Sequence, residues 1–211
     1  MTIFPDTHKV ISSNIYDHVV DKFNIQLDKD KFLWGSIAPD VLPQYKFRRH
    51  YLDDSINFIT MKIVKTIMFN KLIGSHLGSD MMISKYISKE MGIITHYLCD
   101  YVTQPHTQRW TLPGAIVKHM KYEAILNEYV MTHEFKSDVI SVEPLRVEED
   151  NEEALFKSVK EYIIKVVDEY SLKNSFANDL DFALSLNIAI IDFILEESLV
   201  YVPTEAYSFS Y

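Results

Sequence analysis

The sequence predicts an all-α protein, a multi-helix bundle in one domain that covers residues 1–211. Glycine occurs only five times in the 211 residues, and residues that favour helices dominate. Apolar residues recur every three or four positions, as on one face of a helix. Strand-like alternation is confined to the short stretch from Val139 to Val142. A chain of this length, without internal repeats, fits a single domain with a substantial core.

The N-terminal quarter is expected to form one helix and one loop before a second long helix begins. The first helix runs from about His8 to Phe23 and has Asp6 or Thr7 as its cap. Its inward face consists of Ile11, Ile15 and Val19. A loop around residues 35–43 contains glycine and two prolines. The second helix then extends from about residue 52 to residue 73.

Four further helices are expected in the rest of the chain. The third begins at Ser79 or Asp80 and runs to about residue 103, because Pro105 cannot continue it. Pro113 fits the first turn of a fourth helix that ends near Phe135. Residues 136–151 are expected to form a solvated loop. Helices over about 152–172 and 175–200 follow, and their apolar stripes indicate a scaffold, with Ile163, Val167, Tyr170, Leu184, Ile188, Ile191 and Leu195 in the core.

Composition excludes several classes of protein. A hydrophobic content of 47% indicates a globular chain, and a net charge of −9 argues against non-specific binding to nucleic acid or anionic membranes. The single cysteine, Cys99, excludes an intrachain disulfide. The longest apolar run, residues 184–195, is too short for a transmembrane segment, and the first residues do not resemble a signal peptide. We therefore expect a cytoplasmic protein; the sequence does not indicate its oligomeric state.

Side chains of the metal-ligand type recur in the first 123 residues. They are His8, Asp40, His50, His96, Asp100, His106, His119 and Glu123. Five of the eight histidines are among them. Imidazole nitrogens and carboxylate oxygens are the ligands that zinc takes where thiolates are absent. The set is large enough for more than one ion.

Two of these pairs have helical spacing. His96 and Asp100, like His119 and Glu123, are four residues apart, so each pair lies on one face of a helix. The second pair shares a stripe with the apolar residues 116, 126 and 130, which is expected to point inward. Buried ionised groups are costly unless they are paired or bound to a cation. One pair alone is also explained by an ordinary histidine–carboxylate hydrogen bond. Two such pairs on neighbouring helices, together with His106 six residues after Asp100, favour a metal site.

The spacing of these residues resembles that of the zinc-dependent phospholipases C of bacteria. The segment from Trp34 to Asp40 looks like the stretch that leads to this family's loop aspartate. The segment from Tyr97 to His106 looks like the end of its central helix. The resemblance covers His8 to Glu123, somewhat over half of the chain. It implies an all-helical fold of the zinc-dependent phospholipase C type, with two or three zinc ions in a cleft.

The resemblance also implies how the ligands divide among the ions. One zinc would take Asp40, His50, His96 and Asp100. A second would take His106, His119 and Glu123. A third would share Asp100 and take His8. Phe47 matches an aromatic side chain that lines the family's headgroup pocket.

This chain departs from the family near its N-terminus. The family's N-terminal tryptophan, which binds the third zinc, is missing among the seven residues before His8, and a headgroup-binding glutamate is missing too. Val41 stands where the family has a pocket tyrosine. We therefore predict that the third zinc site is occupied weakly or differently, with Asp6 or the amino group of Thr2 as a substitute ligand. We also predict no strong preference for choline lipids.

The function implied by the resemblance is hydrolysis of a phosphodiester or phospholipid, in which metal-activated water attacks phosphorus. Asp40 is the candidate for combined ligand and general base. A related three-zinc nuclease is one alternative, although the acidic chain lacks the basic, aromatic groove expected for nucleic acid. A non-catalytic metal-binding protein with a degenerate site is the other. Histidine and carboxylate ligands do not distinguish zinc from iron or manganese.

The remaining reactive side chains have simpler interpretations. Cys99 is expected to be a small core residue rather than a thiolate ligand. Surface or turn positions are expected for His18, His76 and His133. Arg48 and Arg49 are expected to be solvated charges, although at the edge of a metal cleft they would also suit a phosphate.

Overall fold

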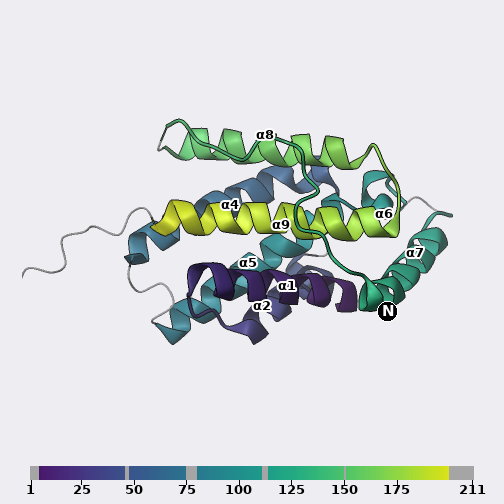
Figure 1. Cartoon of the computed structure of the whole chain (residues 1–211), viewed down its shortest axis with the longest axis horizontal. Coiled ribbons are helices and arrows are strands. Elements are labelled where there is room, and N and C mark those ends of the chain that lie inside the picture. The colour runs from purple at the N-terminus through teal and green to yellow at the C-terminus, as the bar shows by residue number, and fades with distance from the viewer. Residues whose placement is uncertain (1–4, 46–47, 75–79, 111–113, 150, 200–211) are drawn as a thin grey trace, which may run out of the picture.

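The computed structural model describes residues 5–45, 48–74, 80–110, 114–149 and 151–199. All regular secondary structure in these ranges is helical, with no strand, which confirms the all-α prediction (Figure 1). The α-helices are α1 (Pro5–Phe23), α2 (Lys29–Gly35), α3 (Ala38–Val41), α4 (Leu52–Ile73), α5 (Met81–Tyr101), α6 (Gln104–Thr107), α7 (Ile116–Tyr129), α8 (Glu152–Tyr170) and α9 (Phe176–Leu199). Short 3₁₀ turns are η1 (Pro43–Tyr45) and η3 (Val130–Thr132). That residues 1–211 form one domain stays a prediction.

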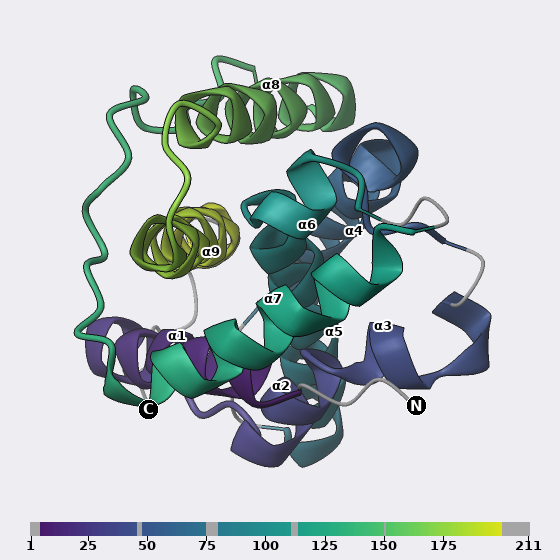
Figure 2. The same cartoon turned by 90° about the vertical axis from the view of Figure 1, so that its right-hand side faces the viewer.

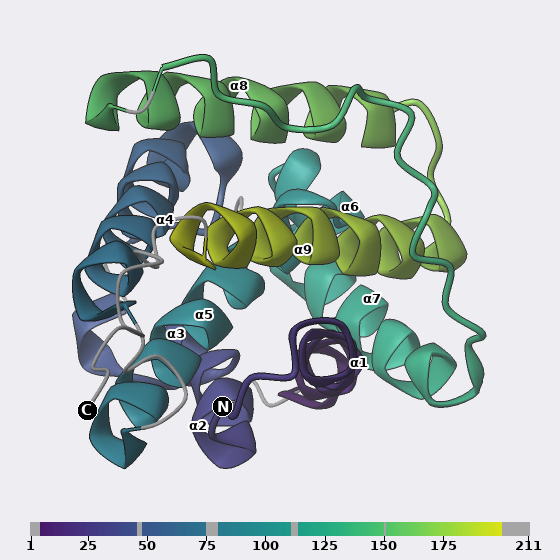
Figure 3. The ribbon, with the colours of Figure 1, turned by 60° about the vertical axis from the view of Figure 1, so that its left-hand side comes forward.

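Helix α9 lies at the centre of the bundle. Figures 2 and 3 show it between α8 on one side and α1 on the other, and it also contacts α4 and α5. Most of α9 is buried, and its buried apolar residues include Leu180, Leu184, Leu186, Ile190, Ile191, Ile194 and Leu195. The predicted inward face of α1 is also confirmed, because Ile11, Ile15 and Val19 are at most 1% exposed.

Two glycines allow α2 and α5 to pack backbone against backbone. A Cβ atom built on Gly92 would lie 2.2 Å from the Phe32 carbonyl oxygen. A Cβ atom built on Gly35 would lie 2.4 Å from the Lys89 carbonyl oxygen. Any larger residue at either position would therefore push the two helices apart. This close contact fixes the chain that follows α2 directly against the middle of α5.

Several predicted boundaries are wrong in informative ways. The predicted loop around residues 35–43 begins with the last residue of α2 and contains the whole of α3. Asp40 therefore lies on a short helix. Helix α1 begins at Pro5, which puts Asp6 and Thr7 inside the helix instead of at its cap. Helix α5 ends at Tyr101, and Pro105 belongs to the separate helix α6. Pro113 lies outside the described residues, and α7 is described from Ile116 onward.

The other predicted helices are confirmed. Asp80 caps α5, because its carboxylate accepts hydrogen bonds from the backbone N–H groups of Met82 and Ile83. Residues 133–149 form no helix and run alongside the bundle to α8 (Figure 2). Among the described residues, none of the helices combines the length and apolar character needed to cross a membrane.

Candidate metal centre

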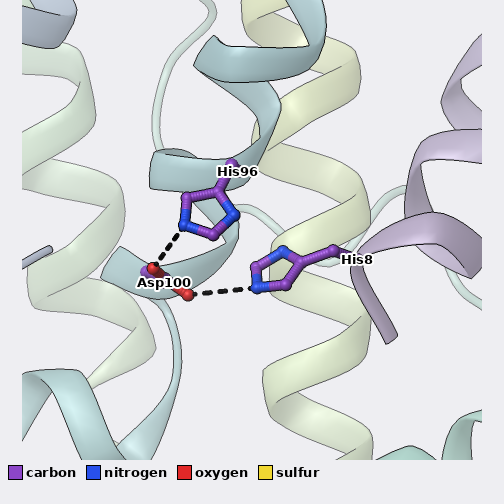
Figure 4. Close-up of side chains that lie close together, drawn as sticks. All are labelled: His8, His96 and Asp100. Carbon is purple, nitrogen blue, oxygen red and sulfur yellow. Dashed lines mark ion pairs between the residues drawn. The ribbon is translucent and has the colours of Figure 1, made fainter. Parts of the chain in front are cut away.

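The centre of the site is the carboxylate of Asp100, near the end of α5. His50 Nδ1 lies 2.8 Å from Asp100 Oδ2, and His96 Nε2, one helical turn earlier on α5, lies 3.3 Å from the same oxygen. His8 Nε2, from α1, approaches Oδ1 at 3.4 Å. His106 Nε2 is 3.7 Å from Oδ2. Figure 4 shows that the two carboxylate oxygens of Asp100 face the rings of His96 and His8, which are stacked with their centroids 4.3 Å apart. Four imidazoles from distant parts of the chain therefore surround one buried carboxylate.

His96 is held by the close contact between α2 and α5. Its Nδ1–H donates to the carbonyl oxygen of Ser36, the residue after α2, at 2.8 Å. A carbonyl oxygen only accepts hydrogen bonds, so Nδ1 carries the proton and Nε2 faces Asp100. Metal-binding histidines are commonly oriented in this way by a bond from their other nitrogen. The glycine pair Gly35 and Gly92 therefore positions a candidate ligand.

His106 is held by a hydroxyl group. Thr103 Oγ1 donates to the Asp100 carbonyl oxygen at 3.0 Å, so it accepts from His106 Nδ1 at 2.8 Å. This arrangement leaves His106 Nε2 unprotonated and directed toward Asp100 in the neutral ring. The chain leaves α5 after Tyr101 and turns at Val102 and Thr103, and Pro105 fits the first turn of α6, which carries His106.

The second pair with helical spacing is less buried than the sequence predicts. His119 Nε2 lies 2.7 Å from Glu123 Oε1, and their side chains are 13% and 31% exposed. Figure 1 shows α7 at one end of the bundle. Within α7, only Tyr122 and Leu126 are buried. Leu126 and Val130 are buried as expected, but Ile116 is 56% exposed. The prediction that the whole stripe faces inward is therefore wrong at its N-terminal end.

The candidate ligands gather in three overlapping groups. In each group the donor atoms lie within 4.8 Å of one another: His8, His96 and Asp100; Asp40, His50 and His96; and His50, Asp100 and His106. His106 and His119 are neighbours, with ring centroids 5.2 Å apart. Among the residues that the structure describes, His106, His119 and Glu123 do not form a comparable group. The assignment of ligands to individual ions stays a prediction.

Asp40 lies at the exposed edge of these groups. Its side chain is 52% exposed, and Oδ1 is 3.6 Å from His96 Nε2 and 3.7 Å from His50 Nδ1. A carboxylate that reaches both solvent and the candidate ligands is well placed to accept a proton from water. Val41, beside it, is 52% exposed. Phe47 lies outside the described residues.

The charges at the centre shift the pKa values of its groups. Burial alone would raise the pKa of Asp100, but the surrounding imidazoles, led by His106 and His96, hold it well below its usual range. Burial opposes protonation of His96, yet Asp100 and Asp40 raise its pKa to about 9. Burial lowers the pKa of His106 to about 4. Asp100 thus stays ionised at neutral pH, and a cation would face a negative carboxylate.

A cavity of about 300 Å³ adjoins the ligands. Its lining includes six candidate ligands, which are His8, Asp40, Asp100, His106, His119 and Glu123, together with apolar side chains such as Ile11, Ile116, Met120, Leu126, Leu180 and Ala183. The cavity volume is at the lower end of the range for small-molecule sites. A mainly apolar pocket with a few polar groups is the usual composition of such a site.

The sequence analysis missed Asp179, a buried carboxylate of α9 that also lines the cavity. Its hydroxyl partners are Tyr122 and Tyr170. No spacing pattern identifies it, because its nearest partner is 9 residues away and the other hydroxyl is 57 residues away. Since α9 contributes a polar group to the cavity, the prediction that the last two helices are only a scaffold is incomplete.

The other reactive side chains lie outside the ligand groups. Cys99 is buried and accepts a hydrogen bond from Asn187 Nδ2 at 3.4 Å, and burial raises the pKa of its thiol, as suits a core residue. His18 pairs with Asp192 at 2.9 Å. His133 is not a surface residue, because its side chain is 8% exposed and pairs with Asp181. Arg48 and Arg49 are exposed, whereas His76 lies outside the described residues.

The donor set fits a transition metal ion. Imidazole nitrogen and carboxylate oxygen are the zinc ligands available in a chain with no free surface thiol. His8 Nδ1 is buried and has no hydrogen-bond partner among the described residues. A buried polar atom of this kind is costly unless an ion or an ordered water completes its contacts.

Comparison with known proteins agrees with this interpretation. A family model described as zinc-dependent phospholipase C matches residues 7–175, a range that contains every candidate ligand. No match was found among curated proteins or among solved structures.

Proposed function

Because this chain belongs to the zinc-dependent phospholipase C family, we propose that it hydrolyses phosphodiesters at the cavity beside Asp100. The observation that carries this proposal is the convergence of Asp40, His50 and His96 with Asp100 at the edge of that cavity. Zinc ions bound there would lower the pKa of a water molecule and polarise phosphoryl oxygens. Attack of that water at phosphorus would release an alcohol and a phosphomonoester.

We propose two well-formed ion sites and a weaker third. The first would use Asp40, His50, His96 and Asp100, and the second would use His106, His119 and Glu123. The third would depend on His8 and a shared Asp100. His119 and Glu123 contact each other, and the ring of His106 lies beside that of His119, which supports the second set.

Asp40 is the proposed general base. Its carboxylate is half exposed and lies within 4 Å of two candidate ligand nitrogens, so it can reach both a water molecule and the ions. The buried Asp100 is less suitable, because its surroundings hold its pKa well below the usual range and make it a poor proton acceptor.

The substrate class follows from the lining of the cavity. The candidate ligands suit the phosphate group, and the apolar side chains, among them Ile11, Leu126 and Leu180, suit an apolar ester group. A phospholipid or a smaller phosphodiester with such a group meets both demands. Val41 is exposed and offers no aromatic face to a quaternary ammonium group, which supports the prediction of no strong choline preference.

The decisive assay compares zinc-loaded wild type with Asp40→Asn on a chromogenic phosphodiester, dispersed phospholipids with different headgroups, and single-stranded DNA. We expect hydrolysis of phosphodiesters by wild type and a loss of two or more orders of magnitude in kcat for the variant. Asp30→Asn is the matched control, because Asp30 is an exposed carboxylate on α2 that does not line the cavity.

Each alternative has its own result. Preferential cleavage of DNA would favour the nuclease interpretation. Equal background rates for wild type and Asp40→Asn on every substrate, with zinc bound, would favour the non-catalytic metal-binding protein. Cell fractionation tests the cytoplasmic location that the sequence predicts.

A further inference from the structure

Asp179 is a buried carboxylate whose partners are hydrogen-bond donors rather than cations. It lies in the first turn of α9 and is fully buried. Within the described part of the chain, no lysine, arginine or histidine forms an ion pair with it. Its Oδ1 accepts from the Tyr170 hydroxyl at 2.7 Å, and its Oδ2 accepts from the Tyr122 hydroxyl and from the Gln104 backbone N–H at 3.2 Å. Removing a carboxylate from water is costly, and these three bonds offset that cost.

Two of the three donors belong to the segments that carry candidate ligands. Gln104 is the first residue of α6 and stands two positions before His106. Tyr122 lies on α7, between His119 and Glu123 in the sequence. A single carboxylate from the central helix is therefore bonded to both segments. Tyr170, the third donor, ends α8 and ties the same carboxylate to the rest of the bundle.

Helix α7 is attached to the bundle along a narrow face. Ile116 and Val117 are each 56% exposed, whereas Tyr122 and Leu126 are buried. Its polar contacts include the bond from Tyr122 to Asp179 and one from the Thr7 backbone N–H to Asn127 Oδ1 at 3.0 Å. With so little of its surface covered, the position of α7 depends on such directional contacts. Hydrogen bonds to a charged group are among the stronger ones.

We propose that Asp179 is a positioning residue for the metal centre, which sets the separation between α6 and α7 by holding Gln104 and Tyr122 on one carboxylate. The separation matters because His106 comes from α6 and the His119–Glu123 pair from α7, and the rings of His106 and His119 are 5.2 Å apart. This inference rests on the proposed assignment of these three residues to one zinc ion. Asp179 itself is not part of the three groups of candidate ligands.

The test measures zinc binding rather than hydrolysis. Zn²⁺ is titrated into metal-free full-length protein in competition with a chromophoric chelator, and the visible spectrum of the Co²⁺-substituted protein reports ligand geometry. Asp179→Asn keeps the size of the side chain but has one acceptor oxygen in place of two. Tyr122→Phe removes only the hydroxyl on the α7 side. We expect each variant to weaken one zinc site by about tenfold and to change the Co²⁺ spectrum.

Two matched controls separate positioning from general stability. Asp181→Asn alters another buried carboxylate of α9, which pairs with His133 and the Lys136 backbone N–H, outside the ligand segments. Tyr16→Phe removes a hydroxyl that donates to the Leu27 carbonyl oxygen at 3.1 Å. Both controls are expected to lower the Tm and to leave zinc affinity and the Co²⁺ spectrum unchanged. If Asp179→Asn does not fold, Tyr122→Phe against Tyr16→Phe decides the question.

His119→Ala separates this inference from the proposed function. If His119→Ala weakens one site but Asp179→Asn and Tyr122→Phe behave like their controls, the positioning role is overturned and the ligand assignment stands. If His119→Ala leaves zinc binding unchanged, the assignment fails and the inference fails with it. If wild type does not hydrolyse phosphodiesters, only the proposed activity is contradicted, because the zinc measurements do not depend on turnover.

Discussion

Asp100 and Asp179 are two buried carboxylates that line the same cavity, and their surroundings shift their pKa values in opposite directions. Imidazoles surround Asp100 and hold its pKa well below the usual range against the effect of burial. Burial raises the pKa of Asp179 to about 6, and the bonds from Tyr122 and Tyr170 oppose this only in part. Burial alone therefore does not decide the direction in which the pKa of a carboxylate shifts. The direction also depends on whether its partners are imidazoles or neutral hydrogen-bond donors.

The difference matches two uses of the same functional group. An ionised carboxylate surrounded by imidazoles attracts a cation, and those imidazoles can bind the cation once they are neutral. A metal site needs both properties at its centre. A carboxylate among hydroxyl and amide donors fixes the positions of the elements that supply them. Asp100 is therefore suited to hold ions, and Asp179 is suited to hold helices.

The largest expected effect is that of Asp100→Asn. The substitution keeps the shape of the side chain but removes the charge that the four imidazoles share. We expect loss of about one equivalent of bound zinc or more, because a neutral amide is a poor zinc ligand. Elemental analysis of the purified variant measures this. If Asp100→Asn and Asp179→Asn retain the same metal content, the two carboxylates do not differ in the way described.

The pH dependence of unfolding separates the two carboxylates by sign. The pKa of Asp179 is about 6 in the folded protein against an ordinary 3.8, so the folded state binds this proton more tightly than the unfolded state. As pH falls from about 6 to 4, metal-free wild type should gain up to about 3 kcal/mol of stability relative to Asp179→Asn. Urea unfolding at several pH values measures the difference.

Asp100 should show the opposite trend in the same experiment. Its folded pKa lies below the ordinary 3.8, so its contribution to stability is present above that pH and is lost as pH falls through the folded pKa. Wild type should therefore lose stability relative to Asp100→Asn as pH falls below the ordinary 3.8, where Asp179 no longer adds a change. Parallel curves for the two variants would contradict the assigned pKa directions.

A smaller effect is expected where the backbone supports the Asp100 centre. Gly92→Ala places a Cβ atom 2.2 Å from the Phe32 carbonyl oxygen, so α2 must move away from α5. We expect a loss of about 2 kcal/mol in unfolding free energy, together with weaker zinc binding, because Ser36 no longer holds His96. Met82→Ala, at an exposed position on the same helix, is the control. Unchanged zinc affinity in Gly92→Ala would show that His96 keeps its orientation without Ser36.

The smallest expected effect is that of Thr103→Val. Valine has nearly the same shape as threonine but cannot accept the hydrogen bond from His106 Nδ1. We expect about tenfold weaker zinc binding, measured by the same chelator competition. Thr103→Ser keeps the hydroxyl and should restore the affinity. An equal loss in both variants would point to the methyl group, and not to the hydrogen bond, as the important feature.

The two carboxylates also illustrate how much the sequence predicts. Asp100 was predicted as a ligand because its spacing from His96 is a local pattern on one helix. Asp179 was missed because its partners lie 9, 57 and 75 residues away and are tyrosines and a backbone group, which carry no pattern. Similar reasons apply to the fold. The long helices follow apolar periodicity, whereas α2 is too short to show it.

The inward face of α7 was predicted only in part for a related reason. Periodicity indicates which residues share a face, but not how far a neighbouring helix extends along it. Ile116 lies beyond the covered part. The Thr103 hydroxyl bond to His106 and the glycine contact behind His96 are likewise products of tertiary structure, since they depend on elements meeting in space.

The central position of α9 has a consequence for the order in which the protein is made. Every candidate ligand precedes α9 in the chain, yet α1, α4, α5 and α8 all pack against this helix. Synthesis runs from the N-terminus, so all eight candidate ligand side chains emerge from the ribosome before the helix against which α1 and α5 pack. During that interval the growing chain displays histidines and carboxylates without the core that orders them, and a metal ion that arrives early meets a chelator of undefined geometry.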